Sequence, residues 1–380
     1  MTLETSRFCT PIGLQTPPEI AFGAGAVANL AAFAARHAAK RILVIADSFN
    51  AARVELLGLP GEIMVFGQVK PEPDLPNLAD ALDYADKIRP DLVVGFGGGS
   101  AMDLAKLVAV LAGSPQTIQD IVGVEKVACR QPALVQVATT SGTGSEAGTR
   151  ALVSDPASGN KLAVQSRHML ADLAIIDPEL TISLPQAVTV ATGIDALAHC
   201  VEAYTSRKSH PVIDVYALTG IELIGQYLGR AAADGADKEA RAALALASLY
   251  GGFCLGPVNT TAGHAVAYPL GTRHHLAHGL SCALIFPHVL AFNAPAVPVK
   301  TARVLSSLGI AETSHPQGIM EATRRWCADL GIDMRLSAYN VPEHDFDTMA
   351  REAYAIRRLL DNNPRDMSEA DIAALYHQAF

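Results

Sequence analysis

Strand-like segments are concentrated in the first half of this 380-residue sequence and almost disappear after it. Up to about residue 185, short runs rich in Val, Ile and Leu alternate with segments whose apolar residues recur with a period near 3.6. Such alternation is typical of βαβ units, which build a parallel sheet with helices on both faces. Strands are expected at 41–46, 62–66, 91–96, 133–138, 150–154, 161–164 and 172–176, and helices at 26–38, 48–56 and 77–87. The segments 150–154 and 161–164 are expected to form a hairpin.

After residue 185 the sequence is a succession of long Ala- and Leu-rich segments. A chain of this length exceeds the roughly 250–300 residues that one hydrophobic core usually holds. We therefore expect two domains, an α/β domain at 1–185 and an all-helical domain at 186–380. Helices are expected at 187–205, 212–230, 236–255, 278–292, 299–308, 316–330, 344–360 and 367–378.

The charge balance and the cysteines exclude several classes of protein. Acidic groups number 38 against 29 basic ones, and no long Lys/Arg run occurs, so neither nucleic acid nor anionic lipid is an expected partner. The N-terminus does not read as a signal peptide, and no run of about 18 apolar residues predicts a membrane-spanning helix. The 6 cysteines are scattered without a C-x-x-C pair, which favours reduced thiols and a cytoplasmic protein.

A glycine-rich turn follows the strand expected at 91–96. Gly97, Gly98, Gly99 and Ser100 stand where that strand ends and a helix begins. Glycines let phosphate groups approach the backbone, and the N–H groups and positive dipole of a helix start attract their charge. The turn lacks the G-x-G-x-x-G fingerprint, so a dinucleotide-binding loop and an ordinary strand–helix turn both remain open here.

A second polar loop, T-T-S-G-T-G-S-E at 139–146, follows the strand expected at 133–138. It fits a loop that wraps a phosphate or a ribose, and it also fits an ST-turn with a helix cap. Two such loops at successive carboxyl ends of a parallel sheet mark the crevice where open α/β folds bind ligands. Together they favour a dinucleotide site, with these candidate contacts in the second loop: Thr139, Thr140, Ser141 and Thr143.

Asp47 directly follows the strand expected at 41–46. A carboxylate at this place accepts hydrogen bonds from ribose hydroxyls and repels a 2′-phosphate, which favours NAD over NADP. Asp47 is equally suited to cap the helix that begins near Phe49, and the two roles are compatible.

Residues of metal-ligand character gather in two places in the helical half. Asp195 and His199 are four residues apart in an Ala-rich helix and project from one face. Four of the 12 histidines, His264, His274, His275 and His278, fall within fifteen residues. Alone, the pair would be an intrahelical hydrogen bond and the histidines a solvated loop. In combination they make a one-carboxylate, three-nitrogen set that suits Zn²⁺ or Fe²⁺.

In combination these motifs resemble the iron-containing (group III) alcohol dehydrogenase family, over nearly the whole chain. The matching segments are Gly97–Ser100 with Asp103 and Lys106, 139–146, D-P-E-L-T at 177–181, Asp195 with His199, and His264, His278-Gly and Pro287-His288. The resemblance implies a Rossmann-like NAD-binding domain followed by a helical domain, the two-domain plan of dehydroquinate synthase, with metal and nicotinamide meeting in the cleft. It also implies a homodimer or larger homo-oligomer.

The resemblance assigns roles to single positions. It places the ligands of Fe²⁺ (or Zn²⁺) on Asp195, His199, His264 and His278, and not on His274, His275 or His288. It places Asp103 and Lys161 near the cofactor. Many family members carry a histidine near the nicotinamide that is implicated in proton transfer, where this sequence has Tyr268. The proton carrier is therefore expected to be Tyr268, His275 or water.

The resemblance further implies metal-assisted hydride transfer between NAD(H) and a primary alcohol or aldehyde. Arg150 aligns with a position that borders the substrate pocket, and Arg273 lies between two of the implied ligands. We hypothesise that one or both bind an anionic group on the substrate, although surface or ion-paired arginines fit equally well. The alternatives are a maleylacetate-reductase-type or hydroxyacid–oxoacid transhydrogenase-type reductase, a lyase of the dehydroquinate-synthase type, and a nucleotide-binding sensor without catalysis.

Overall fold

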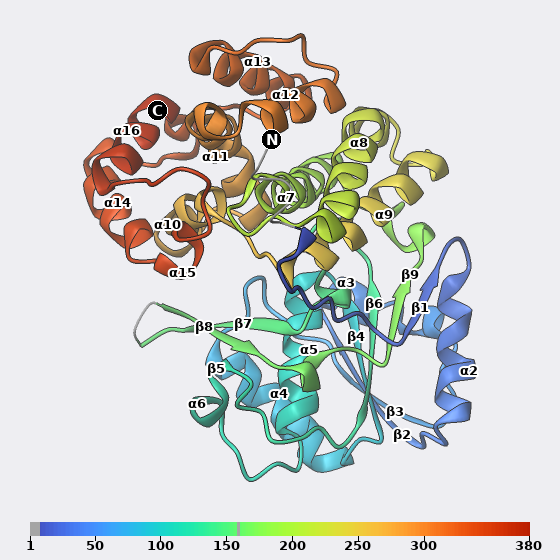
Figure 1. Ribbon diagram of the computed structural model, residues 1–380. Helices are drawn as coiled ribbons and strands as arrows, with labels where there is room; N and C mark the ends of the chain where they lie inside the picture. The colour runs from blue at the N-terminus through green and yellow to red at the C-terminus, as the bar shows by residue number, and fades with distance from the viewer. Residues whose placement is uncertain (1–7, 158–159) are drawn as a thin grey trace. The chain divides into compact units, whose positions relative to one another are not determined.

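The computed structural model describes residues 8–157 and 160–380 (Figure 1). The chain divides into two compact units, one formed by Leu14–Ser183 and the other by Leu184–Phe380 together with the described residues that precede Leu14. The segment before Leu14 was expected in the first domain. It joins the helical unit instead, where the carbonyl oxygen of Thr10 lies 3.1 Å from Nε2 of His210.

The α/β unit is built on a six-stranded parallel sheet with the order β1-β9-β6-β4-β2-β3. Its strands are β1 Glu19–Phe22, β2 Arg41–Ala46, β3 Glu62–Phe66, β4 Leu92–Gly97, β6 Ala133–Ala138 and β9 Leu173–Ile176. All but β1 lie within one residue of the predicted strands. The exception, β1, is a short edge strand that pairs with β9, and its four residues are mostly exposed.

The strands β2, β4, β6 and β9 are buried on both faces of this sheet. Leu43 and Ile45 of β2 face a core under α4 (Leu75–Ile88) and α5 (Gly99–Leu111), while Ile42 and Val44 face a core that includes α2 (Asn29–Arg36). Burial on both faces explains why the strands read as continuous apolar runs instead of alternating ones. The short helical segments of the unit are η1 Ala26–Ala28, α3 Ser48–Ala51, η2 Val54–Leu57, α6 Ile118–Ile121, η3 Ser145–Ala147, η4 Arg167–Met169 and η5 Pro178–Thr181.

A second, three-stranded sheet of the α/β unit has the order β5-β8-β7. It consists of β5 (Gly123–Val124), β7 (Arg150–Asp155) and β8 (Asn160–Gln165). The last two strands pair antiparallel, which confirms the predicted hairpin.

The second unit is helical in every described element. Its elements are α7 Gln186–Thr205, α8 Pro211–Ala233, α9 Lys238–Leu255, α10 Ala262–His274, α11 His278–Asn293, η6 Ala294–Ala296, α12 Pro298–Ser307, α13 Pro316–Asp329, η7 Leu336–Tyr339, η8 Glu343–Asp345, α14 Phe346–Tyr354, α15 Arg357–Leu360 and α16 Glu369–Ala379. An α/β unit followed by a helical unit confirms the predicted fold class. The sequence did not predict α10, because this helix contains Pro269 and is buried around most of its circumference, so its apolar residues show no period.

One described stretch, His278–Ala296, is long and apolar enough to cross a membrane. Within the protein, 72% of its most apolar window is buried. Helix α11, which forms most of this stretch, packs against α7, α10 and α13 as a core helix.

Candidate active site

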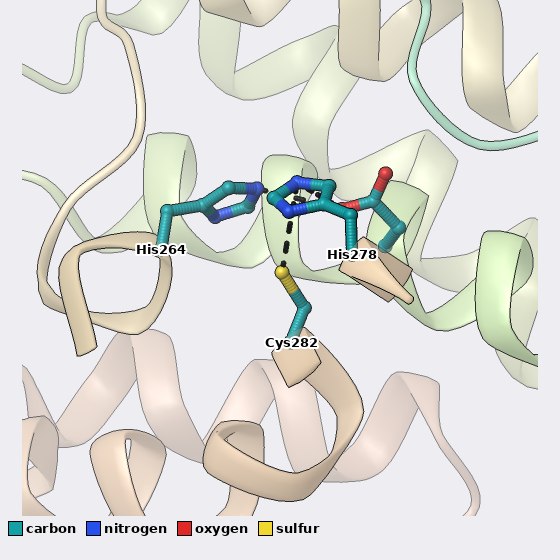
Figure 2. Close-up of side chains that lie close together, drawn as sticks. His264, His278 and Cys282 are labelled. Carbon is teal, nitrogen blue, oxygen red and sulfur yellow. Dashed lines mark hydrogen bonds and ion pairs between the residues drawn. The ribbon is translucent and has the colours of Figure 1, made fainter. Parts of the chain in front are cut away.

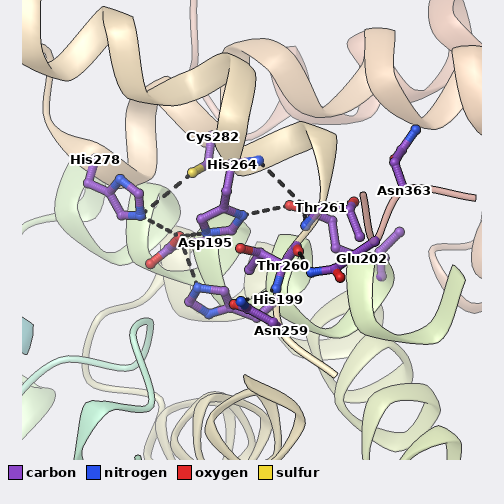
Figure 3. Close-up of polar contacts among 12 residues, drawn as sticks. Asp195, His199, Glu202, Asn259, Thr260, Thr261, His264, His278, Cys282 and Asn363 are labelled. Atoms are coloured by element: carbon purple, nitrogen blue, oxygen red, sulfur yellow. Dashed lines mark hydrogen bonds and ion pairs between the residues drawn. The ribbon is translucent and has the colours of Figure 1, made fainter. Parts of the chain in front are cut away.

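Three histidines converge on one oxygen of a buried carboxylate in the helical unit (Figure 3). Helix α7 carries Asp195 and His199 one turn apart, His264 stands in the first turn of α10, and His278 begins α11. The Nε2 atoms of His199, His264 and His278 lie 3.7, 3.4 and 3.5 Å from Oδ1 of Asp195. The four residues named as metal ligands from the sequence therefore form one cluster.

The spacing of these atoms fits a divalent ion. Distances of 3.4–3.7 Å exceed the 2.7–3.2 Å of ordinary N–H···O hydrogen bonds. Donor atoms around a tetrahedral ion with bonds of about 2.0–2.2 Å are roughly 3.3–3.6 Å apart. Oδ1 of Asp195 and Nε2 of His264 are also buried without a hydrogen-bond partner. Buried polar atoms are normally satisfied, so these two atoms indicate a ligand at the centre of the cluster.

The electrostatics of the cluster point the same way. Burial works against ionised Asp195, yet the facing charges of His199, His278 and His264 hold the pKa of its carboxyl far below its usual value. Burial also works against protonated His264, but Cys282, Glu202 and Asp195 raise its pKa well above the usual value. The negative groups around the imidazoles favour their protonated, positively charged form. The same groups would stabilise a divalent cation that replaces those protons.

Glu202 is a residue of this site that the sequence analysis missed. It is buried on α7, and its Oε1 lies 2.6 Å from Nδ1 of His264. Its other oxygen accepts hydrogen bonds from the backbone N–H and the hydroxyl of Thr261, at 2.5 and 2.9 Å. A carboxylate on the far nitrogen of a ligand histidine fixes its tautomer and orientation. The spacing Asp195, His199, Glu202 places all three on one helix face, a signal present in the sequence.

Gly263 allows α10 to approach this carboxylate. A Cβ built at Gly263 would lie 2.6 Å from Oε1 of Glu202, far inside van der Waals contact. The absence of a side chain thus lets Glu202 reach both Thr261 and His264 at the start of α10.

Cys282 is the second residue that the sequence analysis missed. It follows His278 by one turn of α11 and is buried, and its Sγ lies 3.9 Å from Nε2 of His278 (Figure 2). One ligand atom from each of Asp195, His264, His278 and Cys282 lies within 4.8 Å of the others. The thiol therefore belongs to the same cluster.

The two candidate proton carriers lie in different surroundings. The ring of Tyr268 is 5.9 Å from the ring of His278, next to the ligand cluster. His275 ends α10 in a left-handed conformation with φ of 56°, and its side chain is exposed. The position beside the ligand cluster favours Tyr268 over His275.

The two other histidines excluded as ligands lie in separate surroundings. Nε2 of His274 lies 3.4 Å from a carboxylate oxygen of Asp345, and burial lowers the pKa of His288 to about 4.

Of the two arginines proposed to bind an anionic group, one is already neutralised. Arg273 forms an ion pair with Glu352 at 2.8 Å and lies 3.8 Å from Asp345, so the ion-paired alternative holds for this residue. Arg150 lies on β7, where Nη2 donates to Oε1 of Gln165 at 3.0 Å. Its contact with an anionic group of the substrate stays a prediction.

The predicted cofactor residues of the α/β unit gather at the carboxyl ends of the adjacent parallel strands β2, β4 and β6. Nδ2 of Asn50 donates to Oδ2 of Asp47 at 2.6 Å and lies 3.4 Å from Oγ1 of Thr139. A Cβ built at Gly97 would lie 3.2 Å from that same Asp47 oxygen. Asp47 also caps α3 by accepting from the N–H of Asn50, so the predicted capping role is present.

The glycines of the first loop make room for the second loop. A Cβ at Gly98 would lie 3.1 Å from Oγ1 of Thr140, and one at Gly99 would lie 2.7 Å from Cγ2 of Thr143. Gly98 caps α5 without a side chain, and Ser100 in its first turn accepts from the N–H of Glu72. The two loops thus pack together around the start of a helix, whose first N–H groups have no partner within the helix, the arrangement expected of a phosphate site. Ser141 lies buried within the second loop.

Asp103 and Lys106 form hydrogen bonds that hold the second loop and the strand after it in place. The oxygens of Asp103 accept from Oγ of Ser145 at 2.5 Å and from the N–H of Leu152 at 2.9 Å. Lys106 is fully buried and donates to Ser145 and to the carbonyl of Arg150, both at 2.8 Å. Both residues therefore organise the second loop, and a direct contact of Asp103 with the cofactor stays a prediction. Lys161 pairs with Glu72 at 3.0 Å.

Glu146, at the end of the second loop, makes stability depend on pH. Burial raises the pKa of its carboxyl from 4.5 to about 7. The folded protein therefore keeps a proton that the unfolded chain releases between these values. This stabilisation is full below about pH 4.5 and disappears as the pH rises through about 7.

Replacing Glu146 with Gln should remove this dependence. Between pH 4.5 and 7.5, the free energy of unfolding of wild type should fall by roughly 2–3 kcal/mol more than that of the variant. Urea denaturation across this range measures the difference, with Glu62→Gln, an exposed position on β3, as control. Parallel curves for wild type and Glu146→Gln would contradict the prediction.

Comparison with known proteins connects both units to one family. The model of iron-containing alcohol dehydrogenases matches residues 17–178, and the C-terminal model of the Fe-containing alcohol dehydrogenase family matches 189–380. Long-chain-alcohol dehydrogenase 1 of Geobacillus thermodenitrificans (strain NG80-2) is 37% identical over 379 residues, which cover 96% of this chain and 95% of the relative.

Solved structures agree along the whole chain. A 1,3-propanediol oxidoreductase superposes with a TM-score of 0.92 at 31% identity, covering 98% of this chain and 100% of that one. A sulfoacetaldehyde reductase from Bifidobacterium kashiwanohense, solved in complex with NAD⁺, has a TM-score of 0.87 at 26% identity and covers 97% of this chain and 99% of its own. As its motifs implied, this chain is a member of the iron-containing alcohol dehydrogenase family of oxidoreductases.

Proposed function

We propose that the protein transfers hydride between NAD(H) and a primary alcohol or aldehyde, with Fe²⁺ or Zn²⁺ bound by Asp195, His199, His264 and His278. The observation that carries this proposal is the convergence of three imidazole nitrogens on one carboxylate oxygen. When bound, such an ion supplies Lewis-acid chemistry, which polarises an aldehyde oxygen or lowers the pKa of an alcohol. The ligand set suits either metal.

The α/β unit would bind the dinucleotide. The N–H groups at the start of α5 and the hydroxyls of Thr140 and Thr143 are suited to hold its phosphates. Asp47 would accept hydrogen bonds from the adenosine ribose and disfavour a 2′-phosphate, which favours NAD. Lys161 would extend toward the cofactor from β8.

Tyr268 is our proposed proton carrier. Its ring centre lies 5.9 Å from that of His278, one of the proposed ligands of the ion. A phenol there would donate a proton to the alkoxide formed when hydride reaches an aldehyde, and would receive it back during alcohol oxidation.

The test of the proposed function is hydride transfer that depends on a metal ion. Protein loaded with Fe²⁺ or Zn²⁺ should convert NAD⁺ to NADH steadily with a primary alcohol, many times per active site. Removal of the ion with a chelator should lower the rate by about 100-fold or more, and re-addition should restore it. Absorbance of NADH measures both.

Three results would overturn it in distinguishable ways. Turnover that is insensitive to metal removal would reject the metal role. Reduction of an enoate but no aldehyde would indicate a maleylacetate-reductase-type enzyme. Binding of NAD without net NADH would indicate a lyase that regenerates its cofactor, or a sensor.

We propose in addition that the substrate carries an anionic group bound by Arg358 of α15. Its guanidinium carbon lies 5.9 Å from the ring centre of Tyr268. Among the residues that the structure describes, no carboxylate lies within ion-pair distance of Arg358, in contrast to Arg273. Guanidinium groups bind carboxylates and sulfonates through paired hydrogen bonds. The B. kashiwanohense relative is named for an aldehyde of this kind, sulfoacetaldehyde.

Arg358→Gln tests this substrate class. It should lower kcat/KM for an acid-bearing aldehyde about 10–100-fold, the effect expected when one charge-assisted contact is lost, while a neutral aldehyde of similar size changes little. The matched control is Arg273→Gln, which removes an arginine already paired with Glu352. Equal losses for both aldehydes in Arg358→Gln would reject the assignment.

We also propose a cellular location and an oligomeric state for the protein. All six cysteines are unpaired thiols, four of them buried, which supports a reducing, cytoplasmic location. The family resemblance supports a homodimer or larger homo-oligomer, which sedimentation of the purified protein tests.

A further inference from the structure

We infer that Cys282 supplies a sulfur ligand to the ion of the His264–His278 cluster, and that this ligand makes the site select Zn²⁺ over Fe²⁺. The inference rests on the proposed function, because it requires an ion in that cluster. It concerns a side chain of this chain that the four-residue ligand set does not include.

The position of the sulfur is the first argument. Cys282 lies one turn after His278 on the same face of α11 and points to the same centre (Figure 2). Its Sγ lies 3.9 Å from Nε2 of His278. An ion with a nitrogen bond of about 2.0–2.1 Å and a sulfur bond of about 2.3 Å holds these two atoms roughly 3.5–4 Å apart. The observed separation therefore fits a shared ion.

The second argument is what surrounds the thiol once an ion is bound. In the structure, the thiol contacts Nε2 of His278, and ligand atoms of His264 and Cys282 lie within 4.8 Å of each other. Nε2 of His278 directs its lone pair to the ion when it acts as a ligand, so the thiol loses this acceptor. Cys282 is 2% exposed. The cation is then the nearest group with which the buried sulfur can interact. The sulfur binds it as the thiolate, and its proton is released to solvent.

The consequence for metal choice follows from the softness of sulfur. Nitrogen and oxygen ligands bind Zn²⁺ more tightly than Fe²⁺, and a thiolate favours zinc further. A four-coordinate zinc ion has two overlapping ligand sets available here. One is Asp195, His199, His264 and His278, and in the other Cys282 takes the place of His199.

A different role for Cys282 would be simple core packing. The residue also lines a cavity of about 20 Å³ with Ala198, Val201, Glu202 and Phe286, which has room for one water molecule. A thiol that only fills this space would leave the ligands of the ion unchanged. The experiment below separates the two roles.

Zinc-edge X-ray absorption of the zinc-loaded wild-type protein is the direct test, because it needs no variant. We expect a sulfur neighbour at about 2.3 Å in addition to nitrogen and oxygen at about 2.0–2.1 Å. Protein loaded with Co²⁺ should also show a thiolate-to-cobalt charge-transfer band in the near ultraviolet. That band should disappear in Cys282→Ser and Cys282→Ala.

Competition between metals measures the selectivity. Cys282→Ser should lower the preference for Zn²⁺ over Fe²⁺ by about tenfold or more, measured against a chromophoric chelator. The matched control is Cys327→Ala on α13, a buried thiol of the same unit whose pKa is raised by burial alone. This variant should keep the cobalt band and the metal preference of wild type.

Two kinds of failure are distinguishable. A zinc shell of nitrogen and oxygen only, with identical cobalt spectra in wild type and Cys282→Ser, would overturn the role of Cys282 and leave the proposed function intact. A wild-type protein that retains no ion after loading would overturn the proposed function itself, and the inference with it.

Discussion

Replacing Asp195 with Asn should abolish both metal binding and turnover without unfolding the protein. Asn has the same shape, but it removes the negative charge on which three imidazoles converge at 3.4–3.7 Å. An amide nitrogen would also face ring nitrogens that need their lone pairs for the ion. We expect kcat/KM to fall by at least about 10³-fold, which corresponds to roughly 4 kcal/mol of lost transition-state stabilisation.

Metal content and rate must be measured on the same preparation. Mass spectrometry should find less than one tenth of the wild-type ion in Asp195→Asn, while its thermal unfolding in the presence of chelator stays cooperative. Asp333→Asn is the control, since that aspartate pairs with Arg335 at the surface, where ion pairs contribute little. An Asp195→Asn protein that binds metal and turns over like wild type would reject the site.

The sequence predicted most of the sheet, because a strand that is buried on both faces consists mainly of apolar residues and can be recognised by that run. Strand β2 is apolar throughout after Arg41, β6 is interrupted only by the buried Gln136, and the predicted bounds of both coincide with those observed. Strand β1 leaves no such trace, because it is four residues long and lies at the exposed edge of the sheet. Its pairing with β9 joins segments about 150 residues apart, which no local pattern encodes.

The same distinction explains the candidate site. Asp195 and His199 share a helix face, so their proximity follows from helix geometry. That His264 and His278 join them depends on how α10 and α11 pack on α7. The residue pattern indicated only that histidines of the segment 264–278 complete the set, and the family resemblance selected these two. Arg273 could not be assigned from sequence, because its partner Glu352 is 79 residues away.

Two residues of the cluster were within reach of local reasoning and were overlooked. Glu202 continues the spacing of Asp195 and His199 on α7, and Cys282 follows His278 by four residues. Both lie on the helix face that carries a named ligand. Extending each ligand's face by one turn in both directions would have found them.

Replacing Glu202 with Gln should weaken metal binding through the tautomer of His264. In wild type the carboxylate accepts a hydrogen bond from the N–H at Nδ1 of His264 at 2.6 Å, which leaves the lone pair of Nε2 for an ion. The other oxygen accepts from the N–H of Thr261, so a glutamine must keep its carbonyl there. Its NH₂ group then faces Nδ1, which must become an acceptor. The proton of His264 moves to Nε2 and blocks the ligand position.

We expect Glu202→Gln to lower metal affinity about 10–100-fold, the range found when a carboxylate behind a ligand histidine is lost. Equilibrium dialysis against a metal buffer measures the affinity, and ¹⁵N spectra of the histidines report which ring nitrogen of His264 carries the proton. Glu222→Gln is the matched control, because this glutamate lies on the surface of α8 and pairs with Arg303. A variant that binds metal as tightly as wild type, with Nδ1 of His264 still protonated, would show that Glu202 acts only as a buried anchor for Thr261. A loss of affinity without a change of tautomer would instead assign its effect to charge, because Glu202 then stabilises the cation across the ring without fixing the proton.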